Sequence, residues 1–134
     1  MITRQALKRE KLVYVAVANK SQRYPRGRSS IVYIGTTKKG VGRIAASAAG
    51  QARKLLSNHG VRRLHLFVVS CTSLRGVETW KKLESGLLMA FKDLHWSVPV
   101  GNTQGKNREW RDERDYFSEN RLKNIIRELS TRAS

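Results

Sequence analysis

Three short, largely apolar runs stand out along the chain: Leu12–Val17, Ile31–Ile34 and Leu64–Val69. Runs of this length, rich in β-branched residues, predict buried strands. The segment Asn19–Ser29 separates the first two runs and contains a proline, a glycine and four Lys or Arg residues. This composition predicts a long basic hairpin loop.

Apolar residues recur at helical spacing in much of the remaining chain. These stripes predict one helix over Lys39–Leu56, a second over Val77–Leu94 and a third over about residues 118–131. The predicted order β-β-α-β-α-α indicates an α/β protein of the α+β type, with a small three-stranded, largely antiparallel sheet flanked by helices. A length of 134 residues fits a single domain over residues 1–134.

The charge of the chain is strongly positive and uneven. It carries 27 Lys and Arg against 10 Asp and Glu, a formal net charge of +17. Residues 1–77 hold 16 basic residues and one acid, a net of +15, whereas residues 78–134 hold 11 basic and nine acidic residues, a net of +2. Such an excess repels itself unless a polyanion neutralises it. We therefore expect the N-terminal half to bind nucleic acid, with DNA favoured over RNA, and we expect no membrane partner.

Composition also limits the location of the protein and its metal chemistry. No apolar run approaches the roughly 20 residues of a membrane span, and no signal-peptide core follows the basic N-terminus. Cys71 is the only cysteine, which excludes an intrachain disulfide and favours a reducing, cytoplasmic location. Together with Cys71, the histidines at 59, 65 and 95 lack the paired spacing of a zinc site.

Glu84 interrupts an otherwise apolar stripe of the second predicted helix, next to Leu87 and Leu88. Burying a carboxylate is unfavourable unless it is paired, hydrogen-bonded or bound to a metal. Glu84 is therefore a candidate metal ligand. The alternatives are a position at the edge of the stripe or a structural salt bridge to an arginine.

Arg43 lies on the polar side of the first predicted helix, within its first turns. A helix start with free backbone N–H groups and an arginine suits a phosphate group. The preceding residues Gly40–Gly42 do not form a P-loop, because the Gly-Lys-Ser/Thr ending is absent. The alternative for Arg43 is a solvated helix face.

Five elements occur in an order that one superfamily shares. Tyr14 lies in the first strand and Tyr33-Ile34-Gly35 closes the second. Arg43 then follows on a helix, Glu84 on a later helix, and Asn102 in a stretch that begins with a proline. In these residues the chain resembles the GIY-YIG nuclease superfamily, over about residues 12–104.

The resemblance implies a DNA endonuclease that hydrolyses phosphodiester bonds with one divalent ion, Mg²⁺ or Mn²⁺. Glu84 would be the metal ligand, and a hard cation does prefer such an oxygen donor. Arg43 would stabilise the phosphoryl charge, and Asn102 would position the phosphate or a neighbouring side chain. Tyr14 or Tyr33 would orient the attacking water or accept its proton.

The chain departs from the family pattern at several places: its predicted hairpin loop is longer than usual, and the separation between Glu84 and Asn102 is long. Leu12-Val13-Tyr14 lacks the motif glycine, and Ser47 stands where many members have a histidine or tyrosine. Two other functions therefore stay open: a non-catalytic nucleic-acid-binding protein, ribosomal-like or architectural, and a degenerate nuclease fold retained for binding. A pure binder needs a basic surface but no carboxylate such as Glu84.

Basic side chains in the predicted loops are candidate DNA contacts, which position a protein on the backbone without reading sequence. A merely solvated hairpin loop is the alternative. Trp110 could stack on a base, although packing the last helix onto the core is favoured. We expect a monomer or a homodimer. The candidate DNA-binding residues are Arg23, Arg26, Arg28, Lys38, Lys39, Lys106 and Arg108.

Overall fold

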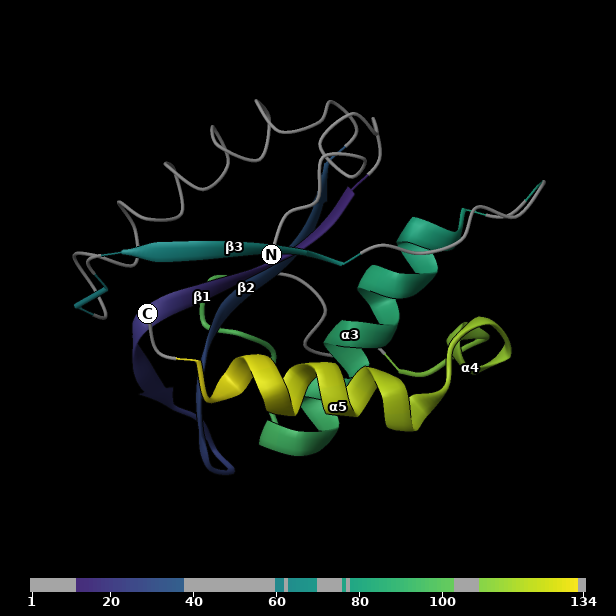
Figure 1. Cartoon of the computed structure of the whole chain (residues 1–134). Coiled ribbons are helices and arrows are strands. Elements are labelled where there is room, and N and C mark those ends of the chain that lie inside the picture. The colour runs from purple at the N-terminus through teal and green to yellow at the C-terminus, as the bar shows by residue number, and fades with distance from the viewer. Residues whose placement is uncertain are drawn as a thin grey trace.

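A computed structural model of the chain describes residues 12–37, 60–61, 63–69, 76, 78–102 and 109–132. The elements in these residues are β1 (Leu12–Arg23), β2 (Arg28–Thr37), β3 (Leu64–Val69), α3 (Thr79–His95), α4 (Glu113–Tyr116) and α5 (Glu119–Ser130). Figure 1 shows α3 and α5 together on one side of the sheet. The helix predicted over Lys39–Leu56 lies outside the described residues.

The sheet has the strand order β2-β1-β3, and β1 pairs antiparallel with both of its neighbours. In this register Tyr14 lies opposite Gly35 on β2 and opposite Val68 on β3. The predicted small antiparallel sheet with flanking helices is thereby confirmed. The strand β2 forms one edge of this sheet.

The predicted long hairpin loop over Asn19–Ser29 is wrong. The strands continue to Arg23 and resume at Arg28, and the turn between them is closed by a hydrogen bond from the Tyr24 N–H to the Gly27 carbonyl at 2.9 Å. Gly27 has a φ of 77°, which glycine adopts without strain. The loop was overestimated because strand pairing satisfies backbone groups, whereas the apolar pattern reports only side-chain burial.

Both long helices fall close to their predicted positions. The second predicted helix is α3, which begins at Thr79 and ends at His95, and the third is α5, which begins at Glu119 and ends at Ser130. The short helix α4 was not predicted, because four residues show no usable periodicity. Among the described residues, none of the helices is both long and apolar enough to cross a membrane.

The two faces of the sheet bury different side chains. Val13, Val15 and Val17 of β1 pack with Leu87 and Phe91 of α3 in the main core, to which α5 also contributes. The alternate positions of β1, which carry Tyr14 and two alanines, belong to clusters on the other face. Strand side chains alternate in this way, so Tyr14 points away from α3.

A bulge in β2 changes which side chains share a face. Ala16 pairs with Tyr33 and Val17 pairs with Ile31, so Val32 is the extra residue. Val32 and Tyr33 consequently pack in the same cluster, on the face opposite α3. The Val32 carbonyl accepts a hydrogen bond from the Gly101 N–H at 2.7 Å. The bulge therefore attaches the loop after α3 to the outer edge of β2.

Candidate active site

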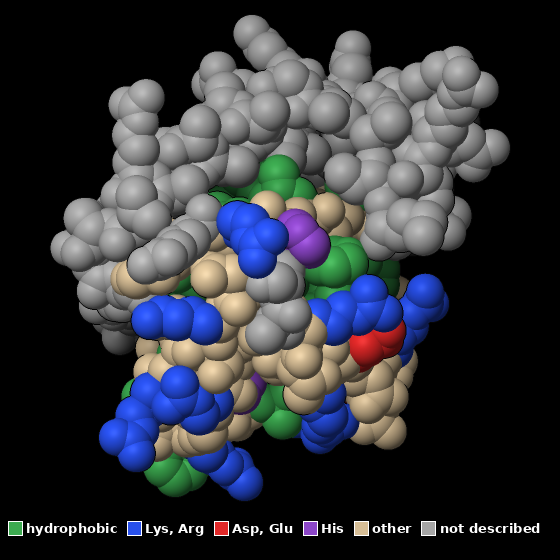
Figure 2. Space-filling view, turned by 60° about the vertical axis from the view of Figure 1, so that its left-hand side comes forward, with side chains coloured by type: hydrophobic (Ala, Val, Ile, Leu, Met, Phe, Trp, Pro, Cys, Tyr) green, Lys and Arg blue, Asp and Glu red, His purple; other side chains and the backbone are tan. Residues whose placement is uncertain are grey.

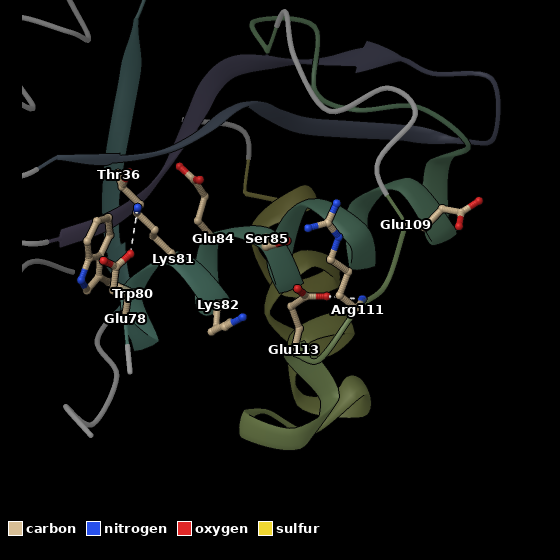
Figure 3. Close-up of a pocket in the computed structure, with 10 residues that line it drawn as sticks. All are labelled: Thr36, Glu78, Trp80, Lys81, Lys82, Glu84, Ser85, Glu109, Arg111 and Glu113. Atoms are coloured by element: carbon tan, nitrogen blue, oxygen red, sulfur yellow. Dashed lines mark hydrogen bonds and ion pairs between the residues drawn. The ribbon is translucent and has the colours of Figure 1, made fainter. Parts of the chain in front are cut away.

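Glu84 borders a pocket of about 520 Å³ between the end of β2, the first half of α3 and residues 109–113. Its helical neighbours Leu83 and Leu87 are fully buried, whereas Glu84 itself is partly exposed. In Figure 3 the Glu84 side chain extends from α3 toward the strands, on the same side as Thr36. Glu84 therefore stands at the edge of the apolar stripe, where its carboxylate reaches the pocket.

The pocket is slightly acidic, although the chain as a whole is strongly basic. The charged residues that line it are Glu78, Glu84, Glu109, Glu113, Lys81, Lys82 and Arg111. Four carboxylates against three cations leave a formal charge of −1. The formal charge of the pocket is thus opposite in sign to that of the whole protein, which is +17.

Two of the cations in the pocket are held by carboxylates. Lys81 Nζ lies 2.8 Å from a Glu78 oxygen, and Lys82 Nζ donates to both Asp112 oxygens at 2.6 and 2.8 Å. The hydrogen bond to Asp112 raises the pKa of Lys82, and the same bond lowers the pKa of Asp112. Both partners of this pair are charged at neutral pH, so Lys82 is compensated from outside the pocket lining.

Glu113 is the deeply buried acid of this region, with 3% of its surface exposed. One of its carboxylate oxygens accepts a hydrogen bond from the Arg111 backbone N–H at 2.8 Å. This bond closes the turn that leads into α4 and fixes the Arg111 segment beside α3 (Figure 3). Glu113 therefore serves to shape one wall of the pocket.

The two tyrosines of the resemblance lie together, with ring centroids 5.7 Å apart and planes inclined by 37°. Tyr14 is 1% exposed, whereas Tyr33 is partly exposed. A Cβ atom at Gly35 would lie 2.6 Å from Tyr33 Cε1 and 3.1 Å from the Tyr14 hydroxyl oxygen. Glycine follows Ile34 because both tyrosine rings occupy the space of a side chain.

Asn102 binds the outer edge of β2 through its side-chain amide. Its Oδ1 accepts from the Ile34 N–H at 3.0 Å, and its Nδ2 donates to the Ile34 carbonyl at 2.9 Å. The amide thus imitates a neighbouring strand and satisfies one residue of the sheet edge. This geometry gives Asn102 a positioning role next to Tyr33.

Four of the five predicted catalytic residues border the C-terminal part of β2, residues 33–36. Tyr33 belongs to that segment, Tyr14 touches it at Gly35, and Asn102 binds it from the edge. Glu84 shares its pocket with Thr36 from the α3 side. The tyrosines and Glu84 lie on opposite faces of the sheet, so they can meet only around its edge. Arg43 lies outside the described residues.

Among the predicted DNA contacts, Arg23, Arg26 and Arg28 are all exposed on the hairpin. Arg28 donates to Ser21 Oγ at 3.0 Å and to the Ser21 carbonyl at 3.2 Å. Figure 2 shows a face on which Lys and Arg side chains are spread widely while acidic ones are scarce. The predicted contacts that lie outside the described residues are Lys38, Lys39, Lys106 and Arg108.

The basic excess of the described residues lies on the sheet side. Residues 12–37 contain four Lys and Arg and no Asp or Glu. Residues 78–102 and 109–132 together contain nine basic and nine acidic residues, a net of zero. A polyanion is therefore attracted to the strands and their hairpin more than to the outer surfaces of α3 and α5.

Sequence reasoning missed the pocket residues Lys81 and Arg111. The helical spacing i, i+3 could have indicated that Lys81 and Glu84 share one side of α3. No local signal connects Arg111 to α3. Trp110 packs against the main core, the role favoured from the sequence over base stacking. Its Nε1 donates to the Asp93 carboxylate at 2.9 Å.

The pocket is lined by carboxylates, and oxygen ligands of this kind are those that hard divalent cations prefer. Among the described residues, no three His, Cys, Asp or Glu side chains gather as a metal-binding group. Mg²⁺ often takes one or two carboxylates and keeps several waters, and the pocket offers the Glu84 carboxylate with room for water.

Neither protein-family models, nor curated proteins, nor solved structures give a match to this chain. The resemblance to the GIY-YIG superfamily thus stays a hypothesis carried by the residues themselves.

Proposed function

We propose that this protein is a metal-dependent endonuclease that hydrolyses phosphodiester bonds of DNA. The observation that carries the proposal is the position of Glu84, a partly exposed carboxylate in a slightly acidic pocket that also borders the end of β2. The same end of β2 carries Tyr33 and contacts Tyr14 and Asn102. The basic excess of residues 12–37, which include β2, would attract the polyanionic substrate to the strand side of this pocket.

In this proposal Glu84 supplies the protein oxygen that holds Mg²⁺ or Mn²⁺. The bound ion would stabilise the charge that develops on the leaving oxygen. Of the two tyrosines, the partly exposed Tyr33 rather than the buried Tyr14 would orient the attacking water. Because Tyr33 and Glu84 lie on opposite faces of the sheet, the substrate would have to lie around the edge of β2 to meet both. Tyr14 and Asn102 then act as positioning residues, because one packs beside the Tyr33 ring and the other holds the adjacent strand edge.

Arg43 keeps the role that the resemblance implies, which is to neutralise the phosphoryl oxygens. An arginine is suited to this because its planar guanidinium offers paired donors to phosphate. Replacement of Arg43 by lysine would retain the charge but lose that paired geometry.

The second candidate function is nucleic-acid binding without cleavage. It is favoured by the exposed hairpin arginines and by the absence of acids in residues 12–37. Binding of this kind follows the salt concentration, because phosphate contacts release counterions. It makes no use of the Glu84 carboxylate, so a variant at that position separates the two functions.

The decisive experiment compares Glu84→Gln with the parent on supercoiled plasmid, in Mg²⁺ and in EDTA. The substitution keeps the side-chain shape but removes the charge, so nicking should fall by about 10²–10³-fold, as when one key electrostatic group is lost. Binding in a gel shift should persist or tighten, because a negative charge leaves a basic protein. Glu128→Gln makes the same charge change on the exposed end of α5 and is the matched control.

Two results would count against this assignment. A Glu84→Gln variant that nicks at the parental rate excludes Glu84 as the metal ligand. A parent that binds plasmid but never nicks it in Mg²⁺ or Mn²⁺ favours the non-catalytic function. Thermal melting of the same variant tests the structural alternative, because loss of a buried ion pair would lower the melting temperature as well.

A further inference from the structure

Trp96 is the one strongly exposed large hydrophobic side chain in the part of the chain that the structure describes, with 65% of its surface accessible. It directly follows α3 and has a left-handed backbone conformation, with φ 61° and ψ 23°. That conformation favours glycine or asparagine and is uncommon for a bulky residue. The left-handed backbone ends α3, because the Trp96 N–H donates to the Lys92 carbonyl at 2.7 Å. The indole ring, in contrast, lies outside the core, and its exposure leaves it accessible to a ligand.

The tip of the hairpin holds this end of α3 in place. The Arg26 N–H donates to the His95 carbonyl at 3.1 Å, and His95 Nδ1 donates back to the Arg26 carbonyl at 2.8 Å. The His95 ring packs against Phe91 and Tyr24, with centroid distances of 4.6 and 5.6 Å. Trp96 is therefore presented by a fixed junction of helix and hairpin.

The surroundings of Trp96 are cationic. The guanidinium carbon of Arg26 lies 5.5 Å from the centre of the indole ring, within the range of a cation–π contact. Arg23 and Arg28 are exposed on the same hairpin, which carries no acid. A ligand that complements this junction combines a flat apolar group with negative charge.

We propose that Trp96 and Arg26 form a stacking site for an unpaired base of single-stranded nucleic acid. The base would lie against the indole, and the phosphates beside it would lie within reach of the hairpin arginines. Aromatic side chains bind single strands in this way without sequence preference, since every base has a π-face. The inference rests on the nucleic-acid binding of the proposed function and is independent of cleavage.

A membrane surface fits the junction around Trp96 less well than a single-stranded nucleic acid does. Interfacial binding needs several bulky apolar side chains on one face. Trp96 stands alone in this respect among the described residues, and its neighbour Ser97 and the hairpin residue Gly27 offer no apolar surface.

The test measures fluorescence anisotropy of a labelled oligothymidine and of a labelled duplex of equal length, in EDTA so that nothing is cleaved. Trp96→Ala should weaken single-strand binding by about 5- to 100-fold and leave duplex binding within about twofold. Trp96→Phe, which keeps an aromatic face, should recover most of the loss. Thermal melting of both variants checks that the fold is retained.

Arg26→Ala tests the phosphate contact separately. It should weaken binding to both probes and lower the salt dependence by about one charge. Arg127→Ala removes another exposed arginine, from α5, and should change neither the affinity for the two probes nor the salt dependence.

Three results would overturn the stacking site. Trp96→Ala could leave the affinity for single strands unchanged, or lower the affinity for single strand and duplex equally. It could also lower only the affinity for anionic lipid vesicles, measured in parallel with the two DNA probes. The last would assign the junction to a membrane. If the parent nicks plasmid but Trp96→Ala leaves the single-strand affinity unchanged, the stacking site is refuted and the proposed nuclease function stands. Binding that depends on Trp96, in a protein that never nicks DNA, supports this site and refutes the nuclease.

Discussion

Substitutions at Asn102 can show whether this residue positions the edge of β2 or acts directly on the substrate. Its amide makes two hydrogen bonds to Ile34, at 3.0 and 2.9 Å, on the outer edge of β2. Each such bond contributes about 0.5–1.5 kcal/mol to stability. Asn102→Ala should therefore lower the free energy of unfolding by about 2 kcal/mol. For a domain of this size, that loss lowers the melting temperature by roughly 6–10 °C.

Asn102→Asp sharpens the test, because it keeps the acceptor and removes the donor. At neutral pH a carboxylate oxygen would face the Ile34 carbonyl oxygen, so we expect a loss at least as large as that of Asn102→Ala. When the new carboxyl is protonated, near or somewhat above pH 4, its O–H can donate to that carbonyl again. The folded state then binds this proton more tightly than the unfolded chain, so the gap to the parent should narrow as pH falls.

Circular dichroism melts of parent and variants, at pH 7 and at pH 4, measure both effects. Asn124→Ala on α5 is the matched control, since its amide accepts only an exposed bond from Arg127 and little should change. Plasmid nicking should fall only in proportion to the folded fraction. If Asn102→Ala has the melting temperature of the parent while its nicking rate drops a hundredfold, the positioning role is refuted and Asn102 acts on the substrate itself.

Two further predictions concern the sheet. Gly35→Ala should lower the free energy of unfolding by about 1–3 kcal/mol in urea denaturation, because the new Cβ would lie 2.6 Å from Tyr33 Cε1, and adding Tyr33→Ala should recover part of that loss. Burial raises the pKa of the Tyr24 hydroxyl to about 12, whereas a tyrosine in the unfolded chain titrates near 10. The folded state thus holds this proton more tightly, so stability should be lost as pH rises from about 10 toward 12, by up to about 3 kcal/mol. The unfolding free energy of Tyr24→Phe, measured over the same pH range, should not show this loss between about pH 10 and 12.

The sequence predicted those elements whose side chains are buried. Leu122, Ile126 and Leu129 are buried at the helical spacing that indicated α5, and the apolar run at the start of β1 is a central strand. The far end of the same strand was missed, because Arg23 pairs with Arg28 through the backbone while both side chains stay in solvent. The hydropathy pattern of a sequence predicts which side chains are buried, but it does not indicate backbone pairing between exposed residues.

The same limit applies to the site. Glu84 was identifiable because a carboxylate within an apolar stripe is unusual, and the structure places it at the edge of that stripe beside a pocket. The residues that complete the pocket wall, such as Arg111 and Glu113, come from a distant segment that no periodicity connects to α3. The bonds between Asn102 and Ile34 join residues 68 positions apart. Such contacts follow from tertiary packing, which a single sequence does not encode locally.

The pocket and the stacking site lie toward opposite ends of α3. Glu84 and Trp96 are twelve positions apart on α3 and its C-cap, and a rise of 1.5 Å per residue separates them by about 18 Å. A nucleic acid that engages both must span at least that distance, which is about five phosphates of a B-form strand. Substitutions this far apart, at residues that do not contact each other, usually have additive effects on free energy. The hairpin can therefore hold a strand whether or not the pocket acts on it. The effects of the Trp96 and Glu84 variants on binding free energy should add, and only the Glu84 variant should lower the cleavage rate of an already bound strand, by about 10²–10³-fold.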